Sequence, residues 1–265
     1  MGAIAGGGTA LFLNTQESFL VLPAVLLMGI LGGVVWGMIP AFLKTKFNAN
    51  EILTSLMLSY VALLILSYLV HGPWRDPGGY NFPESEIFSD FAMLPILLEG
   101  TRLNLGTGFA LLSVLIIYIL LSRTVLGYQF KVVGLAPAAA KHAGFDRAKL
   151  IWLSMIISGG LAGLAGISEV SGTIGQLLPS VSPGYGFTAI IVAFLGRLNP
   201  VGVLFAGLIM ALTYIGGENA QIEIGLPAAV TGLFQGIILF YLLACDVLAR
   251  YRLRYKPLLK ARDRE

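Results

Sequence analysis

Long runs of apolar residues, separated by short polar stretches, are the dominant pattern of this chain. A helix needs about 20 apolar residues to cross about 30 Å of hydrocarbon. Runs near this length occupy residues 19–39, 52–70, 105–122, 150–170, 201–216 and 226–245. Because an unpaired backbone group is costly in lipid, each run is predicted to cross the membrane as a helix.

Two shorter apolar runs complete the pattern. Residues 2–13 could form a truncated or re-entrant helix, and residues 187–195 end shortly before Asn199-Pro200. We interpret 187–195 as a short additional crossing because the charge distribution requires one. The predicted fold class is therefore all-α. We expect a polytopic membrane helix bundle of about seven spans plus a partial N-terminal segment, with one short cytoplasmic helix.

The basic residues indicate which side of the membrane is cytoplasmic. If the spans alternate and the C-terminus is cytoplasmic, one side holds all of the 17 Lys and Arg residues except Arg75 and Arg102. The basic side then carries Lys44, Lys46, Arg123, Lys131, Lys141, Arg147, Lys149, Arg197, Arg250, Arg252, Arg254, Lys256, Lys260, Arg262 and Arg264. This asymmetry matches the positive-inside rule. We predict a multi-pass membrane protein with a basic cytoplasmic tail over residues 246–265.

The composition agrees with an integral membrane protein. Charged residues make up 12% of the 265 residues and hydrophobic residues 57%, whereas soluble domains contain about 25% charged residues. The length suits one transmembrane domain over residues 1–265, without a large soluble domain. The single cysteine, Cys245, excludes a framework of internal disulfides.

The usual signatures of catalysis are missing from the sequence. It contains neither a GxxxxGK[ST] phosphate-binding loop nor an HExxH zinc motif. Residues 166–169 match the GxSx pattern of intramembrane serine proteases. However, His71 and His142 lie in predicted loops on opposite sides of the membrane, so neither can act as a base for Ser168. The sequence thus offers no catalytic site, and if the protein works on ATP energy, the nucleotide site must lie on another subunit.

A short polar island, residues 131–149, separates two of the apolar runs. Pro137 suits the first turn of a helix, and Gly144 can end the helix in a left-handed conformation. The alanines between them favour helix, but about two turns are not stable alone in water. Two interpretations are open. The segment is either an amphipathic helix on the lipid headgroups or a docking element whose small residues let a partner protein approach closely.

Polar residues at the ends of the apolar runs are candidates for a substrate path. An ionisable group at membrane depth usually faces a cavity or a partner. The candidates are Asn50, Glu51, Thr54, Glu169 and Gln176, and Gln235 lies within the last run. For Glu169 the alternative is a place in interfacial water at the end of its helix.

Small residues predict one close helix contact. Gly159 and Gly163 form a GxxxG pair, which lets two helix backbones touch. We interpret this pair as packing, with no chemistry implied.

The largest loop on the less basic side, residues 71–104, is rich in Pro, Gly and Asn, which mark turns. It is either a docking site for an extracytoplasmic delivery protein or a plain connection.

The chain resembles a known protein family in three stretches that follow the same order. They are residues 39–62, 123–149 and 185–208. They are similar to the permease subunits of ABC importers, in the family that includes branched-chain amino acid and ribose permeases. The similarity is greatest to its nucleoside or simple-sugar branch. Ser59 and Tyr185 lie in these stretches, and we add both to the candidate substrate path.

The resemblance implies a role for the polar island. In that family the corresponding loop is the coupling helix, which fits a groove on a cytoplasmic ATPase. The residues implied are Gly134, Pro137, Ala138, Ala139, Ala140, Lys141 and Gly144. It also implies a second permease subunit, identical or different, and an extracytoplasmic substrate-binding protein. It implies a transport subunit and not an enzyme, in a bacterial-type inner membrane. ATP and Mg would be bound by the ATPase, with no cofactor on this chain. The lipid bilayer surrounds the complex, and no nucleic-acid polymer is expected as a partner.

The chain departs from the family pattern at three places. Ser59 and Ala136 stand where the nucleoside-type pattern commonly has Asn, which would affect substrate preference or loop geometry. Members of this branch usually have further spans ahead of the point where this chain begins, so we expect those spans to be missing here. Two alternatives stay open: an ABC permease for branched-chain amino acids or pentoses, and an ion-coupled secondary transporter.

Overall fold

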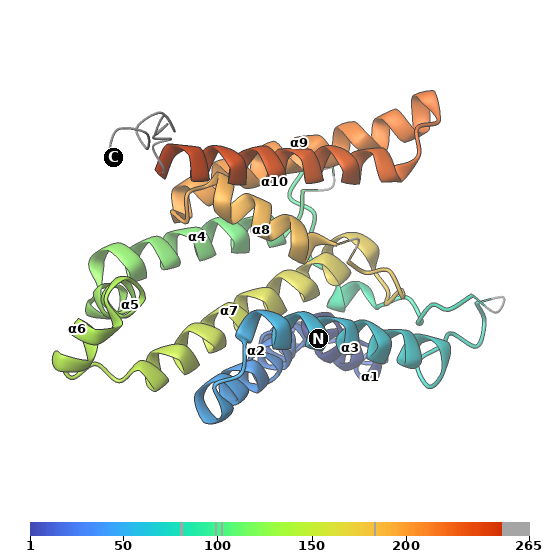
Figure 1. Ribbon diagram of the computed structural model, residues 1–265. Helices are drawn as coiled ribbons and strands as arrows, with labels where there is room; N and C mark the ends of the chain where they lie inside the picture. Colours follow the sequence, from blue (N-terminus) through green and yellow to red (C-terminus); the bar gives the residue numbers. More distant parts are fainter. Residues whose placement is uncertain (80–81, 99, 102, 183, 251–265) are drawn as a thin grey trace, which may run out of the picture. The chain divides into compact units, whose positions relative to one another are not determined.

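The computed structural model describes residues 1–79, 82–98, 100–101, 103–182 and 184–250, and helices dominate these residues (Figure 1). The first helices are α1 (Gly2–Phe12), α2 (Val21–Phe47), α3 (Glu51–His71) and the 3₁₀ turn η1 (Asp90–Ala92). They are followed by α4 (Leu105–Arg123), α5 (Val125–Leu135), α6 (Pro137–His142), α7 (Arg147–Glu169) and the π-helical turn η2 (Val170–Ile174). The last helices are α8 (Tyr185–Leu195), α9 (Pro200–Ile224) and α10 (Ala228–Arg250). Arg102 and residues 251–265 of the predicted basic tail lie outside the described residues.

Within the described residues, 5 helices are long and apolar enough to cross a membrane. They cover Val21–Phe47, Glu51–His71, Leu105–Arg123, Arg147–Ile174 and Pro200–Ile224, and shorter apolar helices cover Gly2–Phe12, Val125–Leu135, Tyr185–Leu195 and Ala229–Ile238. Many of their large apolar side chains are exposed. Such a surface suits contact with lipid and not with water. The structure thus confirms the prediction of an all-α polytopic membrane bundle.

Helix ends differ from the predicted spans where the sequence turns polar. α2 passes through Pro40 and ends at Phe47, so its last turn contains Lys44 and Lys46. Cations interact favourably with the C-terminal end of a helix dipole, which helps to extend α2 beyond its apolar part. α9 likewise continues through polar residues to Ile224 and ends at Gly225, with φ +66°.

Helix α5 was not predicted from hydropathy. Its apolar run is short and is interrupted by Gln129 and Lys131. The side chain of Thr124 caps it by accepting a hydrogen bond from the backbone N–H of Gly127 at 3.2 Å. A local cap therefore starts a helix that the apolar pattern alone does not indicate.

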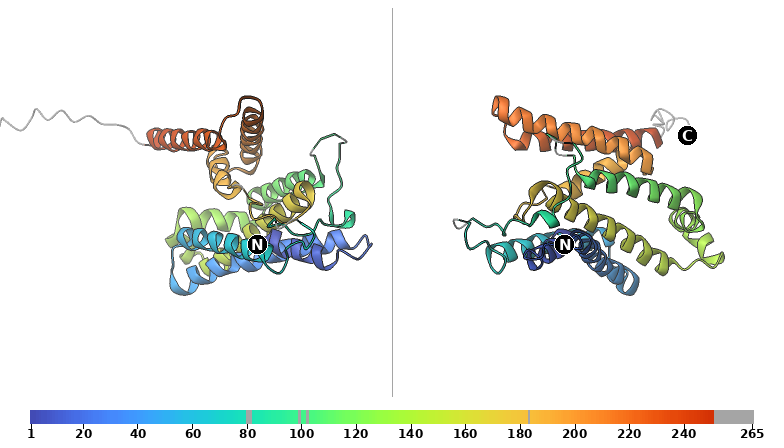
Figure 2. Two further views of the ribbon diagram at one scale, coloured as in Figure 1. Left: turned by 90° about the vertical axis from the view of Figure 1, so that its right-hand side faces the viewer. Right: turned by 180° about the vertical axis from the view of Figure 1, so that it is seen from behind.

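The chain divides into two compact units, Met1–Pro183 and Gly184–Glu265. In the first unit α2 packs along α7, and α1 packs against both (Figures 1 and 2). Buried residues of α1, α2, α3 and α7 form the core, together with η2, the segment that follows it and the loop before α4.

Glycines bring α2 and α7 into backbone contact. A Cβ atom on Gly33 would overlap the carbonyl oxygen of Gly159, and one on Gly163 would overlap the carbonyl oxygen of Gly29. Without side chains between them, the two backbones gain dispersion contacts along their length. This confirms the prediction that Gly159 and Gly163 form a close helix contact.

The loop between α3 and α4 folds back onto the end of α7. The backbone N–H of Phe88 donates to Gly175 O at 2.9 Å, and the N–H of Leu94 donates to Ser171 O at 2.9 Å. Phe88 and Leu94 are both buried. The loop therefore covers backbone groups of η2 that its irregular geometry would otherwise leave unpaired.

The second unit consists of α8, α9 and α10. Arg197 and Leu198 adopt positive φ angles of 52° and 55° in the turn between α8 and α9. The side chain of Asn199 then accepts a hydrogen bond from the N–H of Val201 at 3.0 Å, and Pro200 occupies the first turn of α9. The Asn-Pro pair thus begins a helix at the boundary predicted from the sequence.

Candidate coupling helix and substrate path

The polar island folds as a short helix with defined ends. α6 begins at Pro137, which lies in its first turn. At the other end Gly144 has φ +78°, and the N–H of Phe145 donates to Ala140 O at 3.0 Å. This left-handed ending pairs carbonyls that the last turn leaves open. The predicted start and end of the helix are confirmed.

The helices on both sides hold α6 in place. The rings of Tyr128 in α5 and Phe145 pack edge to face, with centroids 6.3 Å apart. Asp146 caps α7 by accepting hydrogen bonds from the N–H groups of Ala148 at 3.0 Å and Lys149 at 3.3 Å. The bond from the Lys149 amide lowers the pKa of the Asp146 carboxyl below its usual value. α6 therefore packs against α5, and the turn that follows it is fixed by Tyr128 and by the cap of α7.

The side chains of α6 divide between an inner and an outer face. Ala140 is only 2% exposed, so its methyl group packs against this chain. This corrects the expectation that Ala140 would meet a partner. Ala139 and Lys141 are exposed, as are Gly134, Pro137, Ala138 and Gly144. Leu135, just before α6, is 88% exposed and adds an apolar side chain to this surface.

The basic ends of several helices lie together in the first unit. The indole N–H of Trp152 in α7 donates to Thr45 Oγ1 in α2 at 3.1 Å. This contact places Lys44 and Lys46 at the same end of the bundle as the start of α7. The arrangement agrees with the grouping of basic residues on one side of the membrane that the sequence indicates.

The candidates at the start of α3 have local structural partners. Asn50 caps α3 by accepting a hydrogen bond from the N–H of Ile52 at 2.9 Å. Glu51 forms an ion pair with Lys44 at 2.7 Å. The hydroxyl groups of Thr54 and Ser59 donate to backbone carbonyls of their own helix. These four side chains thus stabilise the turn between α2 and α3 and the first part of α3.

Two further candidates lie at the opposite end of the first unit. Glu169 is half-buried in the last turn of α7. The side-chain amide of Gln176, beyond η2, donates to Glu84 Oε2 at 2.9 Å. The distance from Trp152 to Glu169 is about 25 Å along the helix, given a rise of about 1.5 Å per residue. The structure therefore does not bring the candidates of the first unit into one site.

Tyr185 belongs to a polar group that the sequence analysis found only in part. Its ring packs edge to face on Tyr214, with centroids 5.6 Å apart. The hydroxyl groups of Tyr214 and Thr188 are 2.7 Å apart, and Gln235 lies beside Thr188. Thr188 and Tyr214 were missed because both lie inside runs of mainly apolar residues. The i, i+3 spacing of Tyr185 and Thr188 was the available signal.

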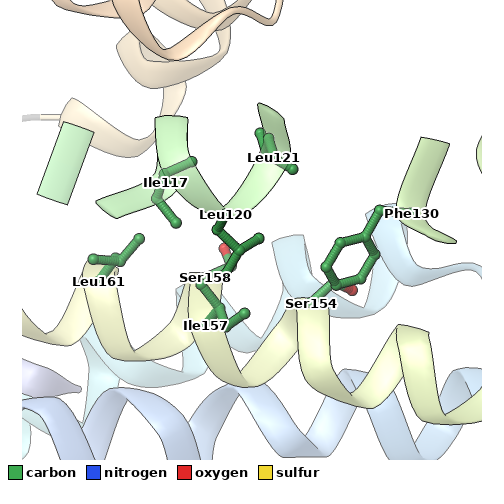
Figure 3. A pocket seen from close by; sticks show the side chains of 8 residues that line it. All are labelled: Ile117, Leu120, Leu121, Phe130, Ser154, Ile157, Ser158 and Leu161. Carbon is green, nitrogen blue, oxygen red and sulfur yellow. The ribbon is translucent and has the colours of Figure 1, made fainter. Parts of the chain in front are cut away.

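A cavity of about 340 Å³ lies between α4, α5 and α7 (Figure 3). It is lined by Ile117, Leu120, Leu121, Phe130, Ser154, Ile157, Ser158 and Leu161. The hydroxyl of Ser154 already donates to Ile151 O at 2.8 Å. A cavity with walls of hydrocarbon and few free polar atoms does not suit a polar substrate.

The part of the chain that the structure describes contains no group of three or more His, Cys, Asp and Glu side chains that could hold a metal ion. The described residues form instead a helix bundle with an apolar outer surface, the short surface helix α6 and polar groups within helices. They place the chain among polytopic α-helical membrane proteins.

The chain belongs to the family described as branched-chain amino acid transport system / permease component, whose profile matches residues 1–243. It is 36% identical to the glucose ABC transporter permease protein TsgB13 of Haloferax volcanii, over 95% of this chain and 68% of that protein. It is 31% identical to the guanosine ABC transporter permease protein NupP of Bacillus subtilis, over 95% of this chain and 72% of that protein. No solved structure matches the chain.

The family assignment confirms that this chain is a transmembrane permease subunit of an ABC transporter. It is a transport subunit and not an enzyme, as the sequence predicted. Membership implies a partnership with an ATPase and a substrate-binding protein in one transporter complex.

Proposed function

We propose that this chain forms part of the membrane path of an importer for a nucleoside or a simple sugar. The relatives named for glucose and guanosine support this substrate class. The observation that carries the mechanism is α6, a short helix with an exposed outer face and an inner face packed on its own chain. A partner protein can apply force to such a helix without unfolding it.

Force applied to α6 can be transmitted directly to α7 and α2. α6 connects to α7 through the Gly144 turn and the Asp146 cap. α7 in turn packs along α2, where glycines bring the two backbones into direct contact. Movement of α6 would therefore carry α7 and α2 as one rigid body, as alternating access requires.

The proposed partners divide the remaining tasks. A cytoplasmic ATPase binds ATP and Mg and contacts the outer face of α6, which is formed by Pro137, Ala138, Ala139 and Lys141. A second permease subunit, identical or different, completes the path. A substrate-binding protein docks on the extracytoplasmic side. The complex lies in a bacterial-type inner membrane with the C-terminus of this chain in the cytoplasm.

The candidate path residues differ in how well they suit substrate contact. Glu169 lies half-buried at the end of α7, and Tyr185 is partly exposed at the start of α8. Both can face a passing molecule. By contrast, Asn50, Glu51, Thr54, Ser59 and Gln176 already stabilise local structure.

The proposal is tested by expressing the full chain with the ATPase, permease and binding protein encoded beside it. We expect the ATPase to copurify with the chain. We also expect cells to take up labelled glucose or guanosine in a process that stops when ATP is depleted. Uptake that survives ATP depletion but stops when ion gradients are dissipated would instead indicate a secondary transporter. Uptake of leucine alone would contradict the proposed substrate class.

A further inference from the structure

Three polar side chains from different helices meet inside the second unit. They are Thr188 of α8, Tyr214 of α9 and Gln235 of α10, which we call the polar triad. Thr188 Oγ1 lies 2.7 Å from the Tyr214 hydroxyl and 3.5 Å from Gln235 Oε1. Thr188 is 7% exposed and Gln235 is 9% exposed. The three helices therefore enclose a polar group within apolar surroundings.

The hydrogen bonds of the polar triad leave one strong donor group unused. If the Tyr214 hydroxyl donates to Thr188 Oγ1, the Thr188 hydroxyl can donate to Gln235 Oε1. The side-chain nitrogen of Gln235 is buried and has no hydrogen-bond partner. An amide nitrogen carries two N–H donors. Two unpaired N–H groups in an apolar setting cost free energy, and a membrane offers no water to pair them.

Solvent exposure decreases from the residues around the polar triad to its buried members. Tyr185, whose ring packs on Tyr214, is 42% exposed, and Tyr214 itself is half-buried. Exposure thus falls from Tyr185 through Tyr214 to Gln235. Aromatic rings offer apolar faces to a ligand, while the tyrosine hydroxyl adds a polar edge.

There is also free space along the contact between α9 and α10. A cavity of about 230 Å³ is lined by Thr213, Gly217, Thr231 and Phe234, among others. Phe234 directly precedes Gln235 in the sequence, and Thr213 directly precedes Tyr214. Thr188, Tyr214 and Gln235 do not line this cavity, which lies on the same two helices as Tyr214 and Gln235.

We infer that the polar triad binds a sugar ring during transport, with the Gln235 amide donating to a ring hydroxyl and Tyr214 contacting the same ring. A polyhydroxylated ring supplies the acceptors that the amide lacks within the chain. Such a ring is common to simple sugars and to the ribose of nucleosides. The inference rests on the proposed function and specifies which residues contact the substrate.

The test uses the complete transporter in proteoliposomes, with labelled glucose and labelled guanosine as separate probes. Gln235→Met keeps the length of the side chain and removes its amide. Tyr214→Phe keeps the ring that packs on Tyr185 and removes only its hydroxyl. Tyr241→Phe is the matched control, because Tyr241 is exposed on α10 and its ring contacts Phe240.

We expect Gln235→Met to raise the KM for the transported probe roughly tenfold, and Tyr214→Phe to raise it several-fold, as buried hydrogen bonds to substrate are lost. The amount of assembled complex should not change in either variant, and Tyr241→Phe should leave both transport and basal ATP hydrolysis unchanged. The probe whose KM changes identifies whether the sugar is free or part of a nucleoside.

A purely structural role for Gln235 predicts a different result. Replacing an unsatisfied buried amide by an apolar side chain of similar shape is then neutral or stabilising. An unchanged KM in both Gln235→Met and Tyr214→Phe would overturn the inference and leave the proposed function intact. Failure of the unsubstituted complex to transport either probe would overturn the proposed function, and the inference with it.

Discussion

At the scale of single residues, glycines decide how closely the central helices pack. Gly33 faces the backbone of α7 with no room for a methyl group, whereas a Cβ atom on Gly207 of α9 meets no atom within 4 Å. The same substitution should therefore have opposite effects at the two positions. A glycine in an open helical position costs stability relative to alanine, but one in a close contact cannot be replaced without moving the helices.

We predict that Gly33→Ala destabilises the protein by about 1–3 kcal/mol, as overpacking does in other close contacts. Gly207→Ala should be neutral or slightly stabilising, because it removes backbone freedom without a clash. Thermal unfolding of the purified complex in detergent measures both effects. Equal stability of the two variants would contradict the packing of α2 on α7 described above.

Asp146 is the second residue with a defined local role. It caps α7 next to α6, and the backbone amide of Lys149 lowers its carboxyl pKa. A lowered pKa means that the cap stabilises the folded chain at all pH values above the usual carboxyl pKa. This contribution is lost as the pH falls through the lowered pKa.

We predict that Asp146→Ala speeds hydrogen exchange at the amides of Ala148 and Lys149 at neutral pH, because the capping oxygen is absent. Asp146→Asn should preserve slow exchange, since an asparagine oxygen can accept the same bonds. In the unsubstituted chain, lowering the pH protonates the Asp146 carboxylate. Hydrogen exchange at these two amides should then be faster than the intrinsic pH dependence of amide exchange predicts. Equal exchange in the Ala and Asn variants would show that the cap does not protect this turn.

At the scale of elements, α6 illustrates what the sequence can and cannot predict. Pro137 and Gly144 marked its ends correctly, because proline and glycine act on the backbone locally. Which alanine faces inward could not be predicted, since three alanines in a row carry no contrast in hydrophobicity. In the fold, where α5 packs against α6, Ala140 is buried and Ala139 and Lys141 are exposed.

We predict that Ala139→Arg prevents copurification of the ATPase, because a long charged side chain would stand on the face proposed to meet it. The variant should reach the membrane in normal amounts, since residue 139 is exposed. Gln16→Arg is the control, as Gln16 is exposed in the turn between α1 and α2. If the Ala139→Arg variant binds the ATPase normally, α6 does not form the proposed contact with the ATPase.

At the scale of the whole molecule, the charge pattern predicts which end of the bundle faces the cytoplasm. The Trp152–Thr45 contact places the ends of α2 and α7 together, which agrees with basic residues from both helices sharing one side. The opposite end holds the loop that covers η2. Residues 77 and 141, both exposed, should therefore lie on opposite sides of the membrane.

Labelling of single cysteines tests this orientation. In a Cys245→Ser background, a membrane-impermeant thiol reagent should label Pro77→Cys in cells whose inner membrane is intact. Lys141→Cys should react only after that membrane is permeabilised. Labelling of Lys141→Cys from outside would place α6 away from any cytoplasmic ATPase and would contradict the proposed mechanism.

The sequence by itself determined the class of protein, the main helices and the short helix between Pro137 and Gly144. These depend on hydropathy, charge and backbone preferences that act over neighbouring residues. Only the tertiary structure decided that α2 is the helix that meets Gly159 and Gly163. It alone also joined Thr188, Tyr214 and Gln235, because contacts between residues far apart in the chain depend on how whole helices pack.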